Sequence, residues 1–406
     1  MPKRLVVCCD GTWNTADQAH AGLPCPTNVT KIALSIARED AAGVRQRVYY
    51  HRGVGTSRWE RLRGGAFGLG LSRNVFDAYH FLIDSYEPGD ELFFFGFSRG
   101  AFTVRSLAGL VRNCGILRPE NADRIGEAWA LYRSQAEHPR GVESTLFRRV
   151  YSHYPRIHFI GVWDTVGALG VPSLGPRWLR PVVRRLNRRW EFHNTELSTR
   201  VDGAFQALAI DERRAAFEPA LWHQQPGACG QELRQVWFTG VHCDIGGGYA
   251  DTSLSDIALL WMADRARDYG LAFQPGAFSP DDSTKKGPRE STSFTVAPDP
   301  MTKPHSSWTK FYRLIKPVDR PIGQAANKPD HLDGAEYLAT TAKRHYDGSL
   351  SYRPPALADY LTNAARVHLE PVPTTAPTKP AGWHVPPHQL VEYLILPILG
   401  GPRVPR

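Results

Sequence analysis

Runs of apolar residues alternate with amphipathic segments along the first three-quarters of the chain. A continuous apolar run is typical of a strand buried in a parallel sheet, whereas apolar positions spaced by three and four are typical of a helix. The pattern predicts strands at residues 4–9, 48–51, 91–95, 157–163 and 233–238, and helices at residues 71–86, 101–111, 197–208 and 255–269. This order predicts an α/β fold with a doubly wound, mostly parallel sheet covered on both faces.

The composition changes beyond residue 274. Residues 274–304 are rich in Pro, Ser, Thr and Asp, and residues 370–388 contain a second proline-rich stretch. Such segments are typical of loops and linkers. We therefore expect a core domain at residues 1–274 and, at residues 275–406, a loop-rich C-terminal extension that packs on or near the core.

Overall composition narrows the class of protein. The hydrophobic fraction of 42% and charged fraction of 22% argue against a disordered or coiled-coil chain. No window reaches the roughly 18 uninterrupted apolar residues of a transmembrane helix, and the N-terminal apolar run lacks a signal-peptide cleavage pattern. We therefore expect a cytoplasmic protein. The six cysteines show no metal-binding spacing, so we expect no metal and no cofactor.

The net charge of +9, from 49 basic and 40 acidic residues, permits an anionic partner such as phospholipid, nucleic acid or an acidic protein. Charge alone does not choose among them. No zinc-finger, RNP-type or basic-zipper pattern is present, so no specific nucleic-acid binding is expected.

The strongest local motif is the sequence Gly-Phe-Ser-Arg-Gly at residues 96–100, between a predicted strand and a predicted helix. A sharp strand-to-helix turn of this kind strains the backbone and exposes the serine hydroxyl above the sheet. Ser98 is therefore the candidate nucleophile, and the backbone N–H of Arg99 is a candidate donor to an oxyanion. The alternative is an ordinary turn in which Ser98 caps the following helix.

A serine nucleophile needs a general base and an orienting acid, and at this type of turn the acid precedes the histidine in the chain. Asp164 follows the predicted strand at residues 157–163, and His242 lies in a glycine-rich loop after the strand at 233–238. Asp164 could instead form an Asx turn, and His242 could be structural. Asp211 is a rival acid, although its charged neighbours favour an exposed ion-pair cluster.

A second oxyanion donor is expected from a loop after an earlier strand. The sequence Asp-Gly-Thr-Trp-Asn at residues 10–14 follows the first predicted strand. Gly11 permits close backbone approach, so the N–H of Gly11 or Thr12 is the candidate. Asp10 could equally be a turn-forming residue.

Four segments taken together, residues 9–14, 96–101, 162–167 and 240–249, resemble an α/β-hydrolase-like domain family. This family was long catalogued as a domain of unknown function and includes phospholipase effectors of type VI secretion. The resemblance extends over about residues 4–270.

The resemblance implies Ser98, Asp164 and His242 as a catalytic triad that hydrolyses carboxylic esters through an acyl-enzyme, with lipid or phospholipid esters as the substrate class. The large membrane-binding regions of the effectors are not evident here. The resemblance also implies export as an effector, by a route without a cleavable signal, as the alternative to a cytoplasmic location.

An arginine-rich segment at residues 177–190 contains six arginines and no acid, with apolar residues on the opposite helical face. It lies between Asp164 and His242, where a helical cap insertion is expected around residues 170–230. The segment could meet an anionic membrane or lipid substrate. Alternatively, it is a solvated helix that packs its apolar stripe on the core.

Two other classes of function stay open. One is an α/β-hydrolase-like binding module without turnover. The other is a protein with a basic surface that binds anionic membrane or nucleic acid.

Overall fold

The computed structural model describes much of the chain. The described residues are 2–11, 19–20, 23–53, 67–134, 139–166, 196–278, 296–307, 317–323, 335–362 and 367–373.

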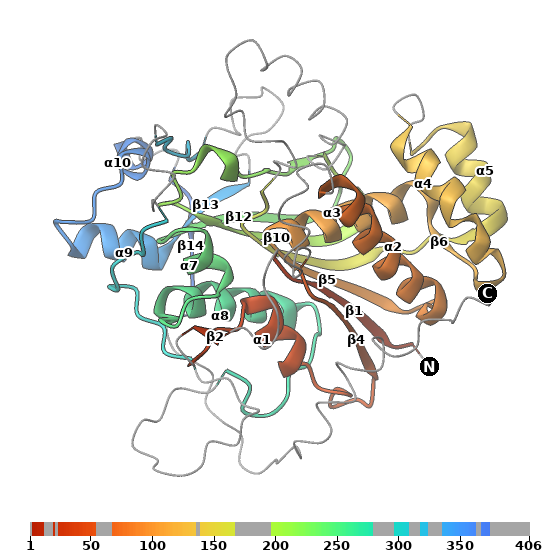
Figure 1. Ribbon diagram of the computed structural model, residues 1–406, viewed down its shortest axis with the longest axis horizontal. Coiled ribbons are helices and arrows are strands. Elements are labelled where there is room, and N and C mark those ends of the chain that lie inside the picture. Colours follow the sequence, from red (N-terminus) through yellow and green to blue (C-terminus); the bar gives the residue numbers. More distant parts are fainter. Residues whose placement is uncertain are drawn as a thin grey trace.

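The centre of the molecule is a parallel sheet of eight strands in the order β14-β13-β12-β10-β8-β5-β1-β4 (Figure 1). Every neighbouring pair in this sheet is parallel. The strands are β1 (Arg4–Cys9), β4 (Gln46–His51), β5 (Glu91–Phe97), β8 (Ile157–Trp163), β10 (Val201–Ala209), β12 (Glu232–Phe238), β13 (Glu336–Ala339) and β14 (Leu369–Glu370).

Helices cover both faces of this sheet. Because successive side chains of a strand point to opposite faces, β1 sends Val6 and Cys8 into a core with α1 (Asn28–Ser35) and α8 (Ser253–Asp268). The alternate positions, among them Leu5 and Val7, pack with α2 (Phe67–Ser85) and α3 (Arg99–Cys114). Figure 1 shows these two pairs of helices on opposite sides of the sheet. The predicted doubly wound α/β fold is confirmed.

Shorter elements surround this framework. The other described helices are α4 (Ile125–Arg133), α5 (Val142–Tyr151), α7 (His242–Gly246), α9 (Thr340–Gly348) and α10 (Pro355–Thr362), with 3₁₀ turns at Pro119–Arg124 and Ala215–Phe217. The short strands are β2 (Ala19–His20), β3 (Leu23–Pro24), β6 (Ile116–Leu117), β7 (Ser152–His153), β9 (Glu196–Leu197) and β11 (His223–Gln224).

One predicted element is wrong: the helix expected at residues 197–208 is strand β10. It is nine residues long, almost completely buried, and lies between β8 and β12. The alanines and leucine of this segment favour a helix in isolation, but pairing with two neighbouring strands in the sheet centre overrides that preference. Residues 201–209 form β10 of the central sheet, so the cap insertion expected around residues 170–230 does not include them.

The central sheet also extends beyond residue 274, where the expected boundary lies. β13 adds to the edge of β12 through Glu336, Tyr337 and Leu338, and β14 then pairs with β13. These strands have four and two residues, too few for a recognisable apolar run. The C-terminal part of the chain therefore completes the sheet.

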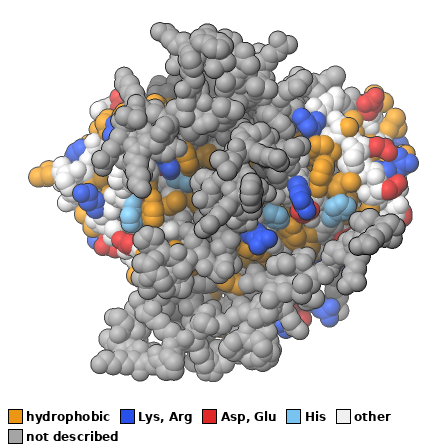
Figure 2. All heavy atoms as spheres, in the orientation of Figure 1, with side chains coloured by type: hydrophobic (Ala, Val, Ile, Leu, Met, Phe, Trp, Pro, Cys, Tyr) orange, Lys and Arg blue, Asp and Glu red, His pale blue; other side chains and the backbone are white. Residues whose placement is uncertain are grey.

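None of the helices formed by the described residues combines the length and apolar character needed to cross a bilayer. On the face shown in Figure 2, the Lys and Arg side chains of the described residues are scattered among acidic and hydrophobic ones. None of the six cysteines, which all lie in the described part of the chain, forms a disulfide bond. Within the same described part, no group of three or more His, Cys, Asp or Glu could hold a metal ion.

Candidate active site

Ser98 lies at the turn between β5 and α3 with φ 56° and ψ −117°. A positive φ is rare for a residue with a side chain and indicates a strained backbone. The N–H of Ser98 donates to Trp163 O of the neighbouring strand at 3.0 Å, which helps to hold the turn. The Ser98 side chain makes no capping hydrogen bond to α3. Ser98 therefore occupies the N-cap position of α3 on a strained strand-to-helix turn, but its side chain does not cap the helix.

The two glycines of the motif are required by close backbone approach. A Cβ atom at Gly96 would lie 2.6 Å from Ala101 Cα, and one at Gly100 would lie 2.0 Å from Cys9 O. Both neighbours are backbone atoms that cannot swing away. The start of α3 thus packs directly against the end of β1, and only glycine fits at these positions.

Asp164 follows the last residue of β8 and also has a positive φ, of 40°. Its N–H donates to Ala207 O at 2.8 Å, and its Oδ1 accepts the Ala209 N–H at 3.1 Å. The carboxylate therefore points across the ends of β8 and β10. Its Oδ2 lies 2.5 Å from Nδ1 of His242, the first residue of α7 after β12.

The His242 imidazole packs against the strand-to-helix turn that carries Ser98. Its ring centroid is 4.6 Å from that of Phe97, the residue before Ser98, and 4.9 Å from that of Phe217. His242 is 5% exposed and Ser98 7%. Of the three expected triad residues, the structure joins Asp164 to His242 by a hydrogen bond. Ser98 and His242 both lie in the described part of the chain, and no hydrogen bond joins Ser98 Oγ to the His242 imidazole.

Sequence reasoning missed Arg320, which holds the same carboxylate. Its Nη1 donates to Asp164 Oδ1 at 2.7 Å and to Ala209 O at 2.9 Å, and its Nη2 donates to Asp164 Oδ2 at 3.1 Å and to Phe217 O. Arg320 is 4% exposed and lies in a proline-containing stretch without strand or helix. No local pattern in the sequence marks it, because the contact spans 156 positions.

The Asp164 carboxylate stays ionised in this setting. Burial by itself raises its pKa, but the Arg320 charge and the hydrogen bond and charge of His242 outweigh burial. The pKa of Asp164 therefore lies well below its ordinary value.

The other acids near His242 have different partners. The Asp211 carboxylate accepts hydrogen bonds from the Gly240 N–H and the Tyr352 hydroxyl. Burial raises its pKa to about 6. Asp244 accepts the Val241 N–H and contacts His305 Nδ1 at 2.6 Å, so it secures the loop that carries His242.

Glu212 reaches the His242 backbone but not its imidazole. Its carboxylate is held by Arg214 and Ser307, and the His242 N–H lies 3.4 Å from Oε2. In the part of the chain that the structure describes, Asp164 is thus the carboxylate bonded to the imidazole.

Two of the three expected oxyanion donors, Arg99 and Gly11, lie where the end of β1 meets the start of α3. Arg99 is the first residue of α3. The Gly11 N–H donates to its neighbour's carboxylate, Asp10 Oδ1, at 2.6 Å. Asp10 is buried and also accepts hydroxyl hydrogen bonds, from Thr27 at 2.6 Å and from Thr30 and Tyr50. Thr12 and the arginine-rich segment 177–190 lie outside the described residues.

The parallel sheet with its flanking helices, and a serine on a strained elbow at the carboxyl end of a central strand, define an α/β-hydrolase-like protein. The chain belongs to the family of Tle1-like phospholipase effectors of the type VI secretion system (T6SS), whose catalytic-domain model matches residues 3–265. The resemblance inferred from four motifs is confirmed.

Two further proteins are similar to this chain. An uncharacterised protein of Saccharomyces cerevisiae, YEL023C, is 29% identical over 248 residues, which is 55% of this chain and 33% of that protein. A crystal structure of an uncharacterised protein from Pseudomonas aeruginosa has 20% sequence identity and a TM-score of 0.42, over 67% of this chain and 46% of that one. This chain thus spans about a third of the length of the yeast protein and less than half of the length of the Pseudomonas aeruginosa protein.

Proposed function

We propose that the protein hydrolyses carboxylic esters of lipids, including phospholipids, with Ser98 as nucleophile, His242 as general base and Asp164 as orienting acid. The observation that carries this proposal is the 2.5 Å contact between Asp164 Oδ2 and His242 Nδ1, with the imidazole packed beside the strained elbow of Ser98. The lipid character of the substrate comes from the family.

The Asp164–His242 pair determines which imidazole nitrogen can act as base. Because the ionised carboxylate faces Nδ1, that nitrogen carries a proton and Nε2 is left to accept one. Nε2 takes the Ser98 hydroxyl proton as Oγ attacks the ester carbonyl carbon. The Oγ–His242 hydrogen bond forms with substrate in place, since such bonds are often long in unliganded sites.

The tetrahedral intermediate places a negative charge beside the start of α3. We propose that the Arg99 backbone N–H donates to this oxyanion, supported by the positive end of the helix dipole. His242 then returns its proton to the leaving alcohol, and water releases the acid from the Ser98 acyl ester by the reverse sequence.

A second oxyanion donor would come from the loop after β1. Gly11 can serve only if its N–H turns away from Asp10 Oδ1, which it contacts at 2.6 Å. The close approach of Gly100 to Cys9 O, at the end of β1, supports a donor from this part of the chain. Thr12 follows directly and is the other candidate.

Substitution of the nucleophile tests the proposal. Ser98→Ala should abolish labelling by a fluorophosphonate probe and lower hydrolysis of p-nitrophenyl esters and phosphatidylcholine by several orders of magnitude, because the covalent step is lost. Ser351→Ala, at an exposed serine, is the matched control and should behave as wild type. Equal turnover by Ser98→Ala would refute the assignment.

The same panel separates hydrolysis from binding alone. A folded wild-type protein that neither reacts with the probe nor cleaves any ester would indicate an α/β-hydrolase-like binding module. The family also leads us to propose that the protein acts as an effector outside the cell that makes it.

A further inference from the structure

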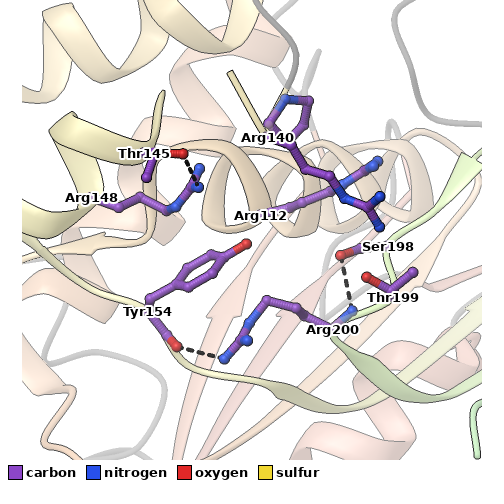
Figure 3. A pocket seen from close by; sticks show the side chains of 9 residues that line it. Arg112, Arg140, Thr145, Arg148, Tyr154, Ser198, Thr199 and Arg200 are labelled. Atoms are coloured by element: carbon purple, nitrogen blue, oxygen red, sulfur yellow. Dashed lines mark hydrogen bonds between the residues drawn. The ribbon is translucent and has the colours of Figure 1, made fainter. Parts of the chain in front are cut away.

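A cavity of about 270 Å³ lies far from the proposed nucleophile, between α3, α5 and the segment before β10 (Figure 3). Four of its nine lining residues are arginines, and no aspartate or glutamate is among those nine. The lining residues are Arg112, Pro139, Arg140, Thr145, Arg148, Tyr154, Ser198, Thr199 and Arg200. We refer to this cavity as the arginine pocket.

Three of these guanidinium groups are held by neutral oxygens. Arg112 donates to Gln225 Oε1 at 2.9 Å, Arg148 to Asn113 O at 2.6 Å, and Arg200 to Tyr154 O at 2.7 Å. These bonds fix the positions of the cations without neutralising their charge. The arginine pocket is thus a concentration of positive charge with preset geometry.

The aromatic ring of Tyr154 separates two of the cations. Arg148 and Arg200 lie 4.5 and 4.1 Å from the ring centroid, and Figure 3 shows the ring between them. Cation–π contact of this kind orients a guanidinium while leaving its N–H groups able to donate. Hydroxyl groups of Thr145, Ser198 and Thr199 complete the lining.

Arg112 and Arg140 approach each other across the pocket (Figure 3). Burial is the main cause of a lowered Arg112 pKa, and the charge of Arg140 lowers it further, whereas Glu196 and Tyr154 raise it. Arg112 is partly buried and Arg140 is exposed, so an anion held between the two guanidinium groups would offset their mutual repulsion. Guanidinium forks bind the oxygens of carboxylate and phosphate groups in a bidentate manner, and a phosphate group offers three strong acceptor oxygens to several arginines at once.

The arginine pocket lies at the amino ends of the parallel strands, whereas the proposed catalytic residues lie at their carboxyl ends. Tyr154 and Arg200 lie just before β8 and β10 begin, whereas Asp164 follows the end of β8. The seven residues of β8 separate the two edges by roughly 20 Å at about 3.3 Å per residue. A ligand here is therefore not the ester under attack.

We propose that the arginine pocket binds a phosphate group with Arg112, Arg140, Arg148 and Arg200 as its donors. The phosphate can belong to a lipid headgroup or to a soluble ion. The arginine pocket is small, so it suits the phosphate group itself more than an acyl chain. This site stands independently of the proposed ester hydrolysis.

Calorimetric titration of the full chain with inorganic phosphate, at low ionic strength, tests the site. Wild type should bind saturably, and Arg112→Gln and Arg140→Gln should each weaken binding about tenfold or more, as expected when a charged donor is lost. Arg149→Gln is the control, because Arg149 is exposed on α5, does not line the pocket, and gives the same change in charge. Melting temperatures should show that all variants are folded.

A second arm identifies the source of the phosphate. Phosphatidylcholine vesicles with and without phosphatidic acid are sedimented with each variant. Binding that requires phosphatidic acid and is lost in Arg112→Gln indicates a lipid headgroup, whereas binding of inorganic phosphate alone indicates a soluble ligand. The proposal is overturned if wild type binds neither probe, or if Arg112→Gln and Arg149→Gln bind equally well. Because neither arm measures ester hydrolysis, failure of the proposed function would not affect the result.

Discussion

Replacement of Gly100 by alanine is the sharpest test of the elbow geometry. The added Cβ would lie 2.0 Å from Cys9 O and 2.5 Å from Asp10 O. Both are backbone atoms at the end of β1, a strand that pairs with β4 on one side and β5 on the other. The clash therefore cannot be relieved by a side-chain rotation, and the start of α3 must move instead.

The size of that movement sets the expected loss. Cβ atoms essentially never approach heavy atoms closer than 3.0 Å, so Gly100→Ala requires a displacement of about 1 Å. A displacement of about 1 Å at a reacting group can cost roughly 100-fold in rate. Because Ser98 immediately precedes α3, we expect kcat/KM for a p-nitrophenyl ester to fall by about that factor.

Gly126→Ala in α4 is the matched control, since a Cβ there meets nothing within 4 Å. Its activity should equal that of wild type, and its stability should rise by up to about 1 kcal/mol from helix propensity. If Gly100→Ala is folded and keeps kcat/KM close to wild type, the close packing of β1 against the elbow does not position Ser98, and the reasoning is wrong.

Two further predictions concern buried charges. Arg320→Gln leaves the Asp164 carboxylate without its cation, so we expect the free energy of unfolding to fall by about 3–5 kcal/mol. Loss of the positive charge should also raise the pKa of Asp164, which Arg320 holds well below its ordinary value, and Arg320→Lys should restore part of both changes. A carboxyl pKa that an NMR titration finds unchanged in Arg320→Gln would contradict this positioning role. Asp211 binds its proton more tightly when folded, with a pKa raised from 3.8 to about 6, so it lowers stability as pH rises through that interval, by about 3 kcal/mol in total. Urea unfolding at pH values from 4 to 7 measures this effect. The free energy of unfolding of Asp211→Asn should rise relative to that of wild type by about the same amount over this range. A difference between the two proteins that does not change with pH would refute the prediction.

The parts of the fold that sequence predicted are those with strong local signals. β1, β5, β8 and β12 are runs of buried residues, and each predicted strand lies within two residues of the observed bounds. β10 was misassigned because its alanines and leucine carry no sign that two strands flank it. Its burial on both faces is a property of the sheet and not of the segment.

The candidate site divides in the same way. Ser98, Asp164 and His242 each follow a recognisable strand, so their positions at the carboxyl ends of parallel strands could be predicted from the topology. The position of Arg320 could not be predicted, because Arg320 does not belong to a strand or helix whose place in the fold the sequence indicates. The arginine pocket could not be predicted either, because its arginines come from α3, α5 and two loops that are separate in the sequence and meet only in the folded chain.

The completion of the sheet by β13 and β14 has a practical consequence for protein production. A recombinant fragment ending near residue 265, where the family match stops, would leave β12 as a bare edge with unpaired backbone groups at Gln235, Val236 and Trp237. Such an edge invites strand addition between copies and hence aggregation. The same truncation would discard Arg320. An expression clone should therefore extend past β14, even though the recognised catalytic region ends about a hundred positions earlier.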